Sequence, residues 1–371
     1  MPHSSEGSRA TVYGLSSAKD GKLYALKLLR RRYRGAHLVA SNERLRPLHD
    51  LPGLAAATRR VVPEAEPAAL RCPDLAYSIL IPWLAGSTWF DLLNEAKAGT
   101  WKLNRGVAIE LCHRFLSMMA GLEARGAAHT DISPGNVMID FRTQEVALLD
   151  LEDMYLPGAR RPIDPSPGAA GYRHVSMTNG ANLWHAAGDR YAAAVLAAEI
   201  LILAEPHLSR LATEQGFFTD HQGTEVGRHR YALAEPWLHL VAPGFLETFR
   251  QSWHESKLEG CPTLVQLRAA LELAKPEIPG FVGWTKWDDP HHVPKKGTAA
   301  PPPQRAIQPG LGEPAVVGFL IGLAVGVAIG LYTGQSVWSW TLSTSTLGWL
   351  GGLIAAVRRR KKASQTPPPA S

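Results

Sequence analysis

The stretch His129-Thr130-Asp131-Ile132-Ser133-Pro134-Gly135-Asn136-Val137-Met138-Ile139-Asp140 joins a polar, turn-rich segment to an apolar run. After a short turn it is followed by a second apolar run that ends in Leu148-Leu149-Asp150-Leu151-Glu152. Asp131 and Asn136 stand five residues apart on what the sequence predicts to be a loop. The two apolar runs on either side of the turn predict the strands of a hairpin, which would bring Asp150 back to the same place.

Phosphoryl transfer needs a carboxylate near the attacking hydroxyl, together with an amide and a second carboxylate that hold a metal ion. The stretch resembles the catalytic loop of eukaryotic-type protein kinases, H-x-D-[LI]-x-x-x-N, followed by the metal-binding D-F-G motif. The resemblance implies that Asp131 orients the acceptor hydroxyl and accepts its proton. It also implies that Asn136 and Asp150 bind Mg²⁺ and that His129 braces the loop. The residues alone allow a plainer reading, in which these side chains only form turns and cap a helix.

A second pair of motifs stands near the N-terminus. The segment from Ser5 to Val12 resembles the kinase glycine-rich loop G-x-G-x-x-G-x-V, of which only the middle glycine, Gly7, is present. Few residues precede this segment, so the first strand is expected to be very short. The run Tyr24-Ala25-Leu26-Lys27-Leu28-Leu29 resembles V-A-[IVM]-K, and Lys27 follows Val12 by fifteen residues, which suits one hairpin. The resemblance places Gly7 and Lys27 at the nucleotide phosphates, whereas the alternative is a solvent-facing lysine on an edge strand.

Apolar residues between Gly35 and Leu51 recur with helical spacing, and Glu43 falls within this predicted helix. In the family that the chain resembles, a glutamate of helix C orients the lysine. Glu43 is therefore the expected partner of Lys27. Glu64 and Glu66 are weaker candidates, because prolines beside them oppose a helix.

The run from Tyr77 to Gly86 predicts a buried strand that leads into a Pro/Gly connection. It resembles the kinase hinge, which implies that backbone groups around Trp83 and Leu84 bind the edge of adenine. Three apolar side chains would then enclose the faces of the adenine ring: Val12, Ala25 and Met138.

The helical pattern of residues 104 to 124 suits a long core helix that leads into the catalytic loop. Residues 188 to 199 resemble the central helix F of kinases, whose aspartate, here Asp189, braces the catalytic loop. Residues 168 to 174 resemble the end of an activation segment. No A-P-E follows, and Cys261 to Leu264 stand where the family has the arginine that pairs with that glutamate, so both partners of a buried ion pair are absent together.

Three further departures bear on the activity. Thr130 replaces the usual arginine, so activation through loop phosphorylation is less expected. Ser133 replaces the catalytic-loop lysine, and Leu151-Glu152 replaces the Phe-Gly of the metal-binding motif.

The composition fits one large or two ordinary globular domains: 371 residues, 45% of them hydrophobic. The three cysteines, Cys72, Cys112 and Cys261, have no paired spacing, which disfavours a disulfide framework or a zinc site. The net charge of +6 is concentrated in blocks at 30 to 32 and 358 to 362. Because the second block adjoins an apolar segment, it indicates membrane topology, and no nucleic-acid partner is expected.

The composition changes after residue 275. Residues 276 to 314 predict a Pro-rich linker, and residues 315 to 334 and 337 to 357 are uncharged and long enough to span a bilayer. Basic residues flank this pair, so the positive-inside rule places both ends, including the tail 358 to 371, in the cytoplasm. The alternative is one span with an exterior tail.

Glycines recur at every fourth position of the first predicted span, at 318, 322, 326, 330 and 334. Such a row permits close helix packing, either with the second span or with a second copy of the chain as a homodimer.

We therefore expect an α+β, bilobal protein-kinase-like fold over residues 1 to 275, with an N-lobe of about 1 to 84 and a C-lobe of about 85 to 275, followed by a C-terminal transmembrane helical hairpin. The expected function is Mg²⁺-dependent transfer from ATP to Ser or Thr hydroxyls of a protein substrate, at the cell membrane with the kinase domain in the cytoplasm. Two rivals remain: a small-molecule phosphotransferase similar to aminoglycoside and choline kinases, and a pseudokinase scaffold.

Overall fold

The computed structural model describes residues 4–6, 9–178, 180 and 182–274. The chain divides into two units at residue 298, and all described residues lie in the first. Gly7, the linker and both predicted membrane spans fall outside the described residues. Among the helices of the described ranges, none combines the length and the apolar character needed to cross a bilayer.

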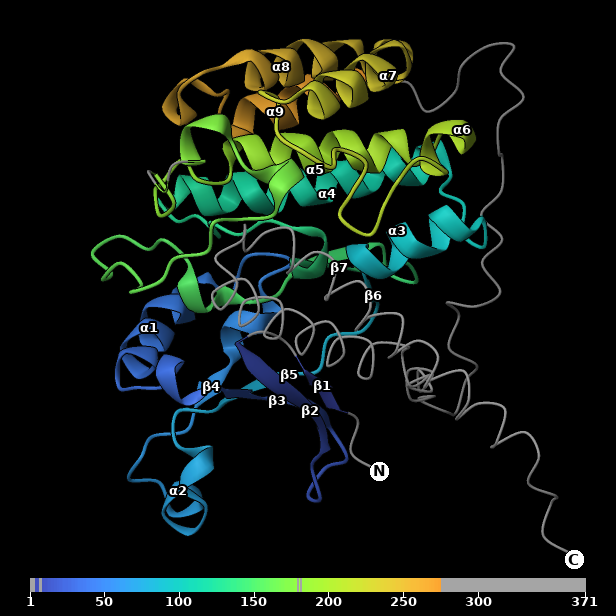
Figure 1. The fold of residues 1–371 in the computed structure, drawn as a ribbon. Coiled ribbons are helices and arrows are strands. Elements are labelled where there is room, and N and C mark those ends of the chain that lie inside the picture. The colour runs from blue at the N-terminus through green and yellow to red at the C-terminus, as the bar shows by residue number, and fades with distance from the viewer. Residues whose placement is uncertain (1–3, 7–8, 179, 181, 275–371) are drawn as a thin grey trace, which may run out of the picture. The chain divides into compact units, whose positions relative to one another are not determined.

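The N-terminal part is an antiparallel sheet with the strand order β1-β2-β3-β5-β4 (Figure 1). Its strands are β1 (Ser4–Glu6), β2 (Ala10–Ser16), β3 (Leu23–Leu29), β4 (Arg60–Val61) and β5 (Ile79–Pro82). Helices α1 (His37–Leu45) and α2 (Pro67–Arg71) lie in the connection between β3 and β5. Val12 pairs directly with Lys27 across β2 and β3, so their side chains face the same side of the sheet.

A second, three-stranded sheet follows, with the order β6-β7-β8. It consists of β6 (Ser87–Thr88), β7 (Val137–Asp140) and β8 (Glu145–Leu148), which confirms the predicted hairpin. Val137 and Ile139 are fully buried on one face of β7, and alternate residues are less buried. This alternation turns the hairpin's apolar face toward the helices.

The remaining elements form a helical part that lies beyond the hairpin in Figure 1. Its helices are α3 (Trp89–Ala98), α4 (Arg105–Ala124), α5 (Arg190–Ile202), α6 (Pro206–Ser209), α7 (Glu225–Val241), α8 (Pro243–His254) and α9 (Leu264–Leu271). The predicted long helix is confirmed as α4, and Asn104 caps it by accepting hydrogen bonds from the Gly106 and Val107 N–H groups. Together the two parts form a mixed α+β fold that is compatible with a kinase-like architecture.

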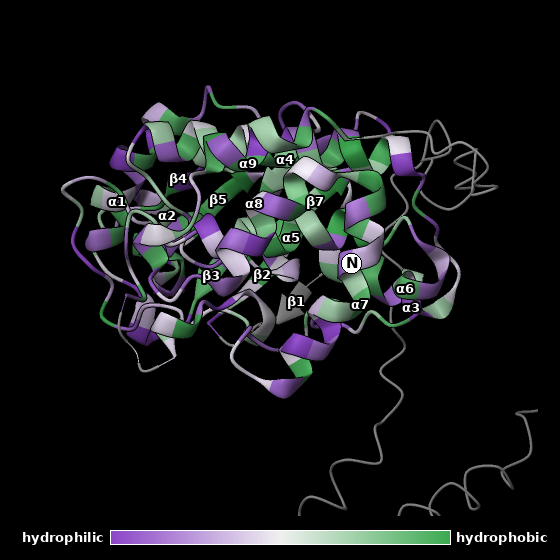
Figure 2. Cartoon of the chain, turned by 90° about the horizontal axis from the view of Figure 1, so that it is seen from above, coloured by the Kyte–Doolittle hydropathy of each residue, from purple (hydrophilic) through white to green (hydrophobic). Residues whose placement is uncertain are grey.

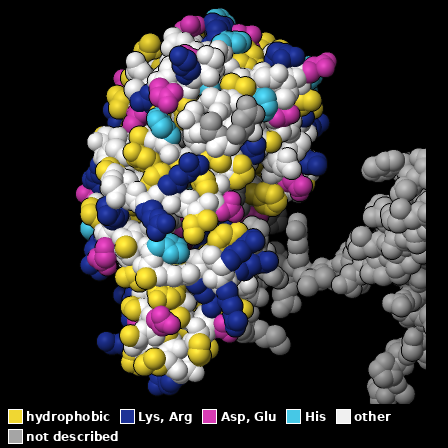
Figure 3. Space-filling model, turned by 60° about the vertical axis from the view of Figure 1, so that its left-hand side comes forward, with side chains coloured by type: hydrophobic (Ala, Val, Ile, Leu, Met, Phe, Trp, Pro, Cys, Tyr) yellow, Lys and Arg dark blue, Asp and Glu magenta, His cyan; other side chains and the backbone are white. Residues whose placement is uncertain are grey.

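Helix α5 is the centre of the helical part, because every residue from Tyr191 to Ile202 is buried. A helix that is buried in this way must be covered by other elements on all sides. The outer helix α8, in contrast, carries hydrophilic and hydrophobic residues in alternation (Figure 2), as expected for a helix with one solvent face. On the face of the molecule in Figure 3, basic side chains are interspersed with acidic and apolar ones.

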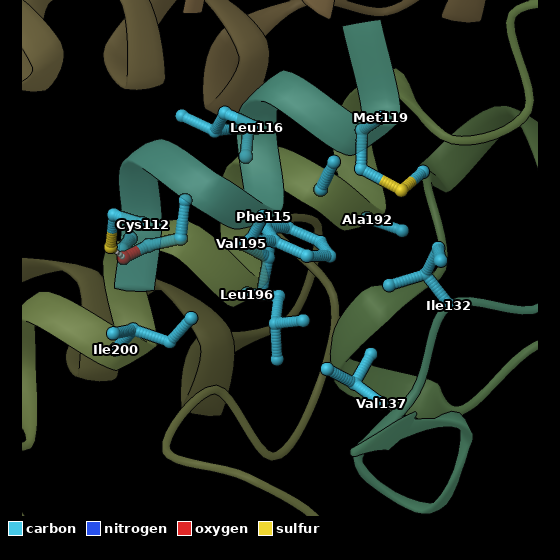
Figure 4. Packing of buried hydrophobic residues seen from close by; sticks show 14 of the residues in the cluster. Cys112, Phe115, Leu116, Met119, Ile132, Val137, Ala192, Val195, Leu196 and Ile200 are labelled. Carbon is cyan, nitrogen blue, oxygen red and sulfur yellow. Dashed lines mark hydrogen bonds between the residues drawn. The ribbon is translucent and has the colours of Figure 1, made fainter. Parts of the chain in front are cut away.

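The hydrophobic core includes apolar residues of the predicted catalytic loop. Ile132 and Val137, which flank the loop's polar residues, are buried and lie beside Phe115 of α4 and Leu196 of α5 (Figure 4). Burying two such side chains contributes on the order of 3 kcal/mol or more of stability. The loop is thus anchored by its apolar residues.

Candidate functional site

The predicted catalytic loop holds its two polar residues together. The Asn136 side-chain amide donates to the main-chain oxygen of Asp131 at 2.8 Å and to its carboxylate Oδ2 at 3.2 Å. Since the amide nitrogen is used in this way, the side-chain oxygen of Asn136 points elsewhere. Asp131 and Asn136 are therefore neighbours in space, held in a fixed relative orientation.

The loop is tied to helix α5 through Asp189. This buried carboxylate accepts hydrogen bonds from the main-chain N–H groups of His129 at 2.5 Å and Thr130 at 2.8 Å. His129 in turn uses Nε2 to reach the Leu149 carbonyl oxygen at 2.6 Å, which links the loop to the end of the hairpin. Burial raises the pKa of Asp189, and the two N–H donors act against that rise. Asp189 and His129 thus link the predicted catalytic loop to helix α5 and to the hairpin, and their roles in catalysis stay predictions.

Two non-glycine residues with positive φ lie in this loop and in the turn after the hairpin. Thr130 and Asp150 both have positive φ, 65° and 57°. For a β-branched residue such as Thr130 this conformation is an outlier, with a cost of about 1–3 kcal/mol. Strained residues of this kind gather at functional sites, where the surrounding contacts hold them. Here the bonds to Asp189 hold Thr130.

Lys27 connects the N-terminal sheet to the turn after the hairpin. The lysine is buried, and its ammonium contacts the Asp150 carboxylate directly and Glu152 Oε2 at 3.0 Å. The other oxygen of Glu152 accepts from Arg59 Nη1 at 2.7 Å, and Arg59 is also buried. Two cations thus face two carboxylates, so the cluster is balanced in charge.

The charges in this cluster shift each other's pKa values. Burial alone would lower the pKa of Lys27, but the charges of Glu152 and Asp150 outweigh it and raise the pKa above its ordinary value. Burial likewise opposes ionisation of Glu152, yet Lys27 and Arg59 lower its pKa to about 2. Lys27 and Glu152 are therefore both charged at neutral pH.

The expected pairing of Lys27 with Glu43 is wrong. Helix α1 buries Leu38, Asn42 and Leu45, a stripe at helical spacing, and this stripe turns Glu43 to the surface. There Glu43 pairs with Arg46 at 3.4 Å. Glu152 from the altered metal-binding motif takes the place that was expected for Glu43.

The predicted nucleotide-contacting residues are placed as follows. The Trp83 N–H donates to the Leu23 carbonyl at 3.1 Å, so this N–H group is engaged within the sheet rather than presented to a ligand. Ala25 lies two residues before Lys27 on β3 and therefore faces the same side as Lys27 and Val12. Met138 lies on β7 and is half-buried. The adenine contacts of Leu84 and of these apolar residues stay predictions.

The side chains at the site fit a magnesium ion. Mg²⁺ prefers oxygen ligands and is bound in kinases by one or two protein groups together with phosphate oxygens. Asp150 supplies a carboxylate whose side chain is 53% exposed, and Asn136 keeps its amide oxygen free of the contacts with Asp131. In the described part of the chain no group of three or more His, Cys, Asp or Glu could hold a metal ion. Phosphate oxygens would therefore have to complete such a site.

The surroundings of Asp131 favour the protonated form of its carboxyl. Burial raises the pKa of its carboxyl above the ordinary value, and the Asp150 charge adds to the rise, while His129, the Ser166 hydroxyl and Arg9 oppose it. A carboxylate with a raised pKa is a better proton acceptor, because its proton affinity is closer to that of the hydroxyl from which it takes the proton.

The segment that approaches Asp131 was not singled out from the sequence. We call residues Asp164 to Gly168 the strap. Arg9 donates to the Asp164 carbonyl at 2.9 Å, and the Gly168 N–H donates to the Ser166 hydroxyl at 3.1 Å. Arg9 also forms an ion pair with Asp153. No local pattern marks these residues, because the contacts join parts of the chain that are distant in sequence.

Comparisons with known proteins give limited support for a family. No family model matches the chain. A stretch of 157 residues, 40% of the chain, is 25% identical to the serine/threonine-protein kinase pkn3 of Myxococcus xanthus. The chain covers 27% of the length of that relative. The match indicates a distant kinase-like relationship.

Proposed function

We propose that this chain transfers the γ-phosphoryl group of ATP to the Ser or Thr hydroxyl of a protein. The proposal rests on one observation. Lys27 of the N-terminal sheet contacts Asp150 and Glu152 in the turn after the hairpin, and the loop before the same hairpin holds Asp131 and Asn136 together. The kinase-like match of part of the chain supports the same reaction class.

In this proposal each side chain has a separate task. Lys27, held by Glu152, presents its charge to the α and β phosphates. Asp131 orients the acceptor hydroxyl and takes its proton. Mg²⁺ between Asn136 and Asp150 would offset the phosphate charge. Thr130 and Ser133 leave the loop without the cations that the kinase motif carries at these positions, so the rate depends more heavily on Lys27 and the metal.

The rival substrate class is a small molecule, and the D-x-E form of Asp150 to Glu152 favours it. A protein acceptor is favoured by the match of part of the chain to a serine/threonine-protein kinase. We therefore propose protein hydroxyls, and not small molecules, as the acceptors.

The test is a transfer assay with γ-labelled ATP and MgCl₂, with casein, kanamycin and choline offered as acceptors in separate reactions. The proposal expects label in the Ser or Thr residues of casein, and none without Mg²⁺. Label in kanamycin or choline instead would establish the small-molecule class. ATP binding without transfer to any acceptor would establish the pseudokinase.

We also propose that residues 315 to 334 and 337 to 357 tether the kinase domain to the cell membrane, and that the glycine row mediates a homodimer. This rests on the sequence alone. Tags at Met1 and Ser371 should both resist protease added outside sealed right-side-out vesicles, whereas loss of the C-terminal tag alone would establish a single span. Replacing Gly322 and Gly326 with Leu should weaken crosslinking between copies, and unchanged crosslinking would assign the row to packing within the hairpin.

A further inference from the structure

A group of exposed arginines near the predicted catalytic loop has no acidic partner. We call it the arginine rim, and its members are Arg31, Arg32, Arg44, Arg160 and Arg161. Each is exposed, and within the described ranges no carboxylate lies at ion-pair distance from any of them. Guanidinium groups without a matching carboxylate leave a local excess of positive charge. Other arginines of the N-terminal part are matched: Arg34 with Asp74, Arg46 with Glu43 and Arg60 with Glu66.

Contacts with the main chain place three of these arginines along one segment, residues 157 to 164. Arg44 Nη1 of helix α1 donates to the Pro157 carbonyl at 3.3 Å. Arg160 and Arg161 lie within the segment. Its far end is held by Arg9, which directly precedes β2 and donates to the Asp164 carbonyl at 2.9 Å. The segment therefore runs from helix α1 to the start of β2.

Tyr33 brings the other two arginines to the same end of this segment. The guanidinium carbon of Arg32 lies 4.7 Å from the centroid of the Tyr33 ring, and that of Arg9 lies 5.2 Å from it. Cation–π contacts of this kind hold a guanidinium group over the ring. Because Arg9 also binds the Asp164 carbonyl, Arg32 and its neighbour Arg31 lie close to that end of the segment.

Arg9 also connects the rim to the predicted catalytic loop. Its guanidinium group forms an ion pair with the Asp153 carboxylate. The Asp153 carbonyl accepts a hydrogen bond from Thr130 Oγ1 at 3.3 Å, and Thr130 directly precedes Asp131. The rim thus lies beside the place where an acceptor has to approach Asp131.

We propose that the arginine rim is a specificity-determining surface, which binds negatively charged residues of a protein acceptor whose Ser or Thr hydroxyl lies at Asp131. The inference rests on the proposed function and names its substrate class. The anionic groups are Asp and Glu carboxylates or the phosphates of an acceptor that is already phosphorylated, since guanidinium groups bind both. An exposed ion pair contributes little by itself, so selection requires several arginines together.

An anionic bilayer is the other partner that a basic surface of this kind attracts. Ile163 of the same segment is 96% exposed, which suits insertion into a bilayer. Single exposed apolar side chains are normal on protein surfaces, however. The contacts with Asp153 and Thr130 place the rim next to the catalytic loop, so the observations favour a protein acceptor.

The experiment measures kcat/KM of the full-length protein with ATP and MgCl₂ for three acceptors: casein, dephosphorylated casein and histone. Casein is acidic and phosphorylated, dephosphorylated casein keeps its carboxylates without the phosphates, and histone is basic. The readout is the ratio of kcat/KM for casein to kcat/KM for histone, because a ratio within one preparation cancels any loss of folded protein.

Two double variants of the rim are compared with a matched control. One variant combines Arg160→Gln with Arg161→Gln, and the other combines Arg31→Gln with Arg32→Gln. The control removes the same charge from two exposed arginines outside the rim, Arg71→Gln at the end of α2 and Arg210→Gln directly after α6.

The proposal expects the wild-type protein and the control to prefer casein over histone. In each rim variant the ratio should fall by about 3- to 10-fold, because one exposed ion pair contributes a factor of up to about five. The fall should appear in KM for casein rather than in kcat. A preference that is lost with dephosphorylated casein identifies phosphates as the groups bound, and one that persists identifies carboxylates. Either result supports the assignment.

An unchanged ratio in both rim variants, or equal labelling of casein and histone by the wild-type protein, would overturn this assignment alone. Sedimentation with phosphatidylserine vesicles is measured in parallel. Sedimentation that falls in the rim variants while the ratio stays unchanged would assign the arginines to a bilayer instead. Absence of transfer to all three acceptors would overturn the proposed function together with the assignment.

Discussion

Lys27 Nζ lies 3.0 Å from Glu152 Oε2, although 125 residues separate the two in the chain. Glu152 comes two residues after Asp150, so one turn brings both carboxylates to the same ammonium. Arg59 Nη1 forms an ion pair with the second carboxylate oxygen of Glu152, Oε1, at 2.7 Å. The position of Lys27 therefore depends on this turn and on Arg59, and not on the exposed Glu43 of helix α1.

This relationship predicts different outcomes for two glutamates. Glu152→Gln leaves Lys27 and Arg59 buried with one carboxylate between them, and breaking a buried pair costs about 3 kcal/mol of the free energy of unfolding. Glu43→Gln should change that free energy by less than about 0.5 kcal/mol, since it alters only a surface pair. Urea denaturation of both variants provides the comparison. Equal losses would mean that Glu43 supports the site after all.

The contribution of Glu152 should depend on pH in a defined direction. Its pKa in the folded protein is about 2, below the ordinary value of 4.5, so the folded state favours the ionised form. The stabilisation is therefore complete above pH 4.5 and is lost as the pH falls toward 2. The difference in unfolding free energy between wild type and Glu152→Gln should shrink over this range. A difference that stays constant or grows on acidification would show that Glu152 is not held ionised by Lys27 and Arg59.

The rate of transfer should fall on the acid side as Asp131 becomes protonated. Burial raises the pKa of this carboxyl above 3.8, so the midpoint of the acid limb should lie above 3.8. The measurement is kcat/KM against pH, with circular dichroism at each pH to show that the protein stays folded. An acid limb centred below 3.8 in folded protein would remove Asp131 from the role of base.

Asp189 should act as a positioning residue for the loop. Asp189→Ala leaves the buried N–H groups of His129 and Thr130 without their acceptor, at a cost of about 1–3 kcal/mol for each group. Because the strained Thr130 then loses its support, kcat should fall more than the affinity for ATP. Asp189→Asn, which keeps one acceptor oxygen, should recover part of kcat. No recovery by Asn over Ala would indicate a purely structural effect of the substitution.

The parts of the fold that depend on local pattern were predictable. The hairpin around residue 142 and helix α4 follow from apolar periodicity, which is a short-range signal. The positions of Asp131, Asn136 and Asp150 relative to one another follow from the same hairpin. These predictions needed only the residues of the segment itself.

The contacts of Lys27 were not predictable in the same way. Glu43 and Glu152 are both carboxylates at plausible positions, and the choice between them depends on which face of α1 is buried. The sequence does contain one usable signal, because Leu38, Asn42 and Leu45 mark a buried stripe from which Glu43 is excluded. Arg59 and the strap are joined to the site only by tertiary packing, and neither carries a motif.

The most direct test of the account is phosphoryl transfer by Asp131→Asn, compared with Asp140→Asn. Asp140 lies at the end of β7 and accepts a hydrogen bond from the Arg142 N–H, so the control makes the same substitution on the hairpin that follows the loop, outside the site. Asp131→Asn should lower Mg²⁺-dependent transfer from ATP by about 10²–10⁴-fold. Its affinity for ATP should be nearly unchanged, because the proposed contact of Asp131 is with the acceptor hydroxyl and not with the nucleotide. Asp140→Asn should transfer at close to the wild-type rate. Undiminished transfer by Asp131→Asn would show that Asp131 does not take the proton of the acceptor hydroxyl.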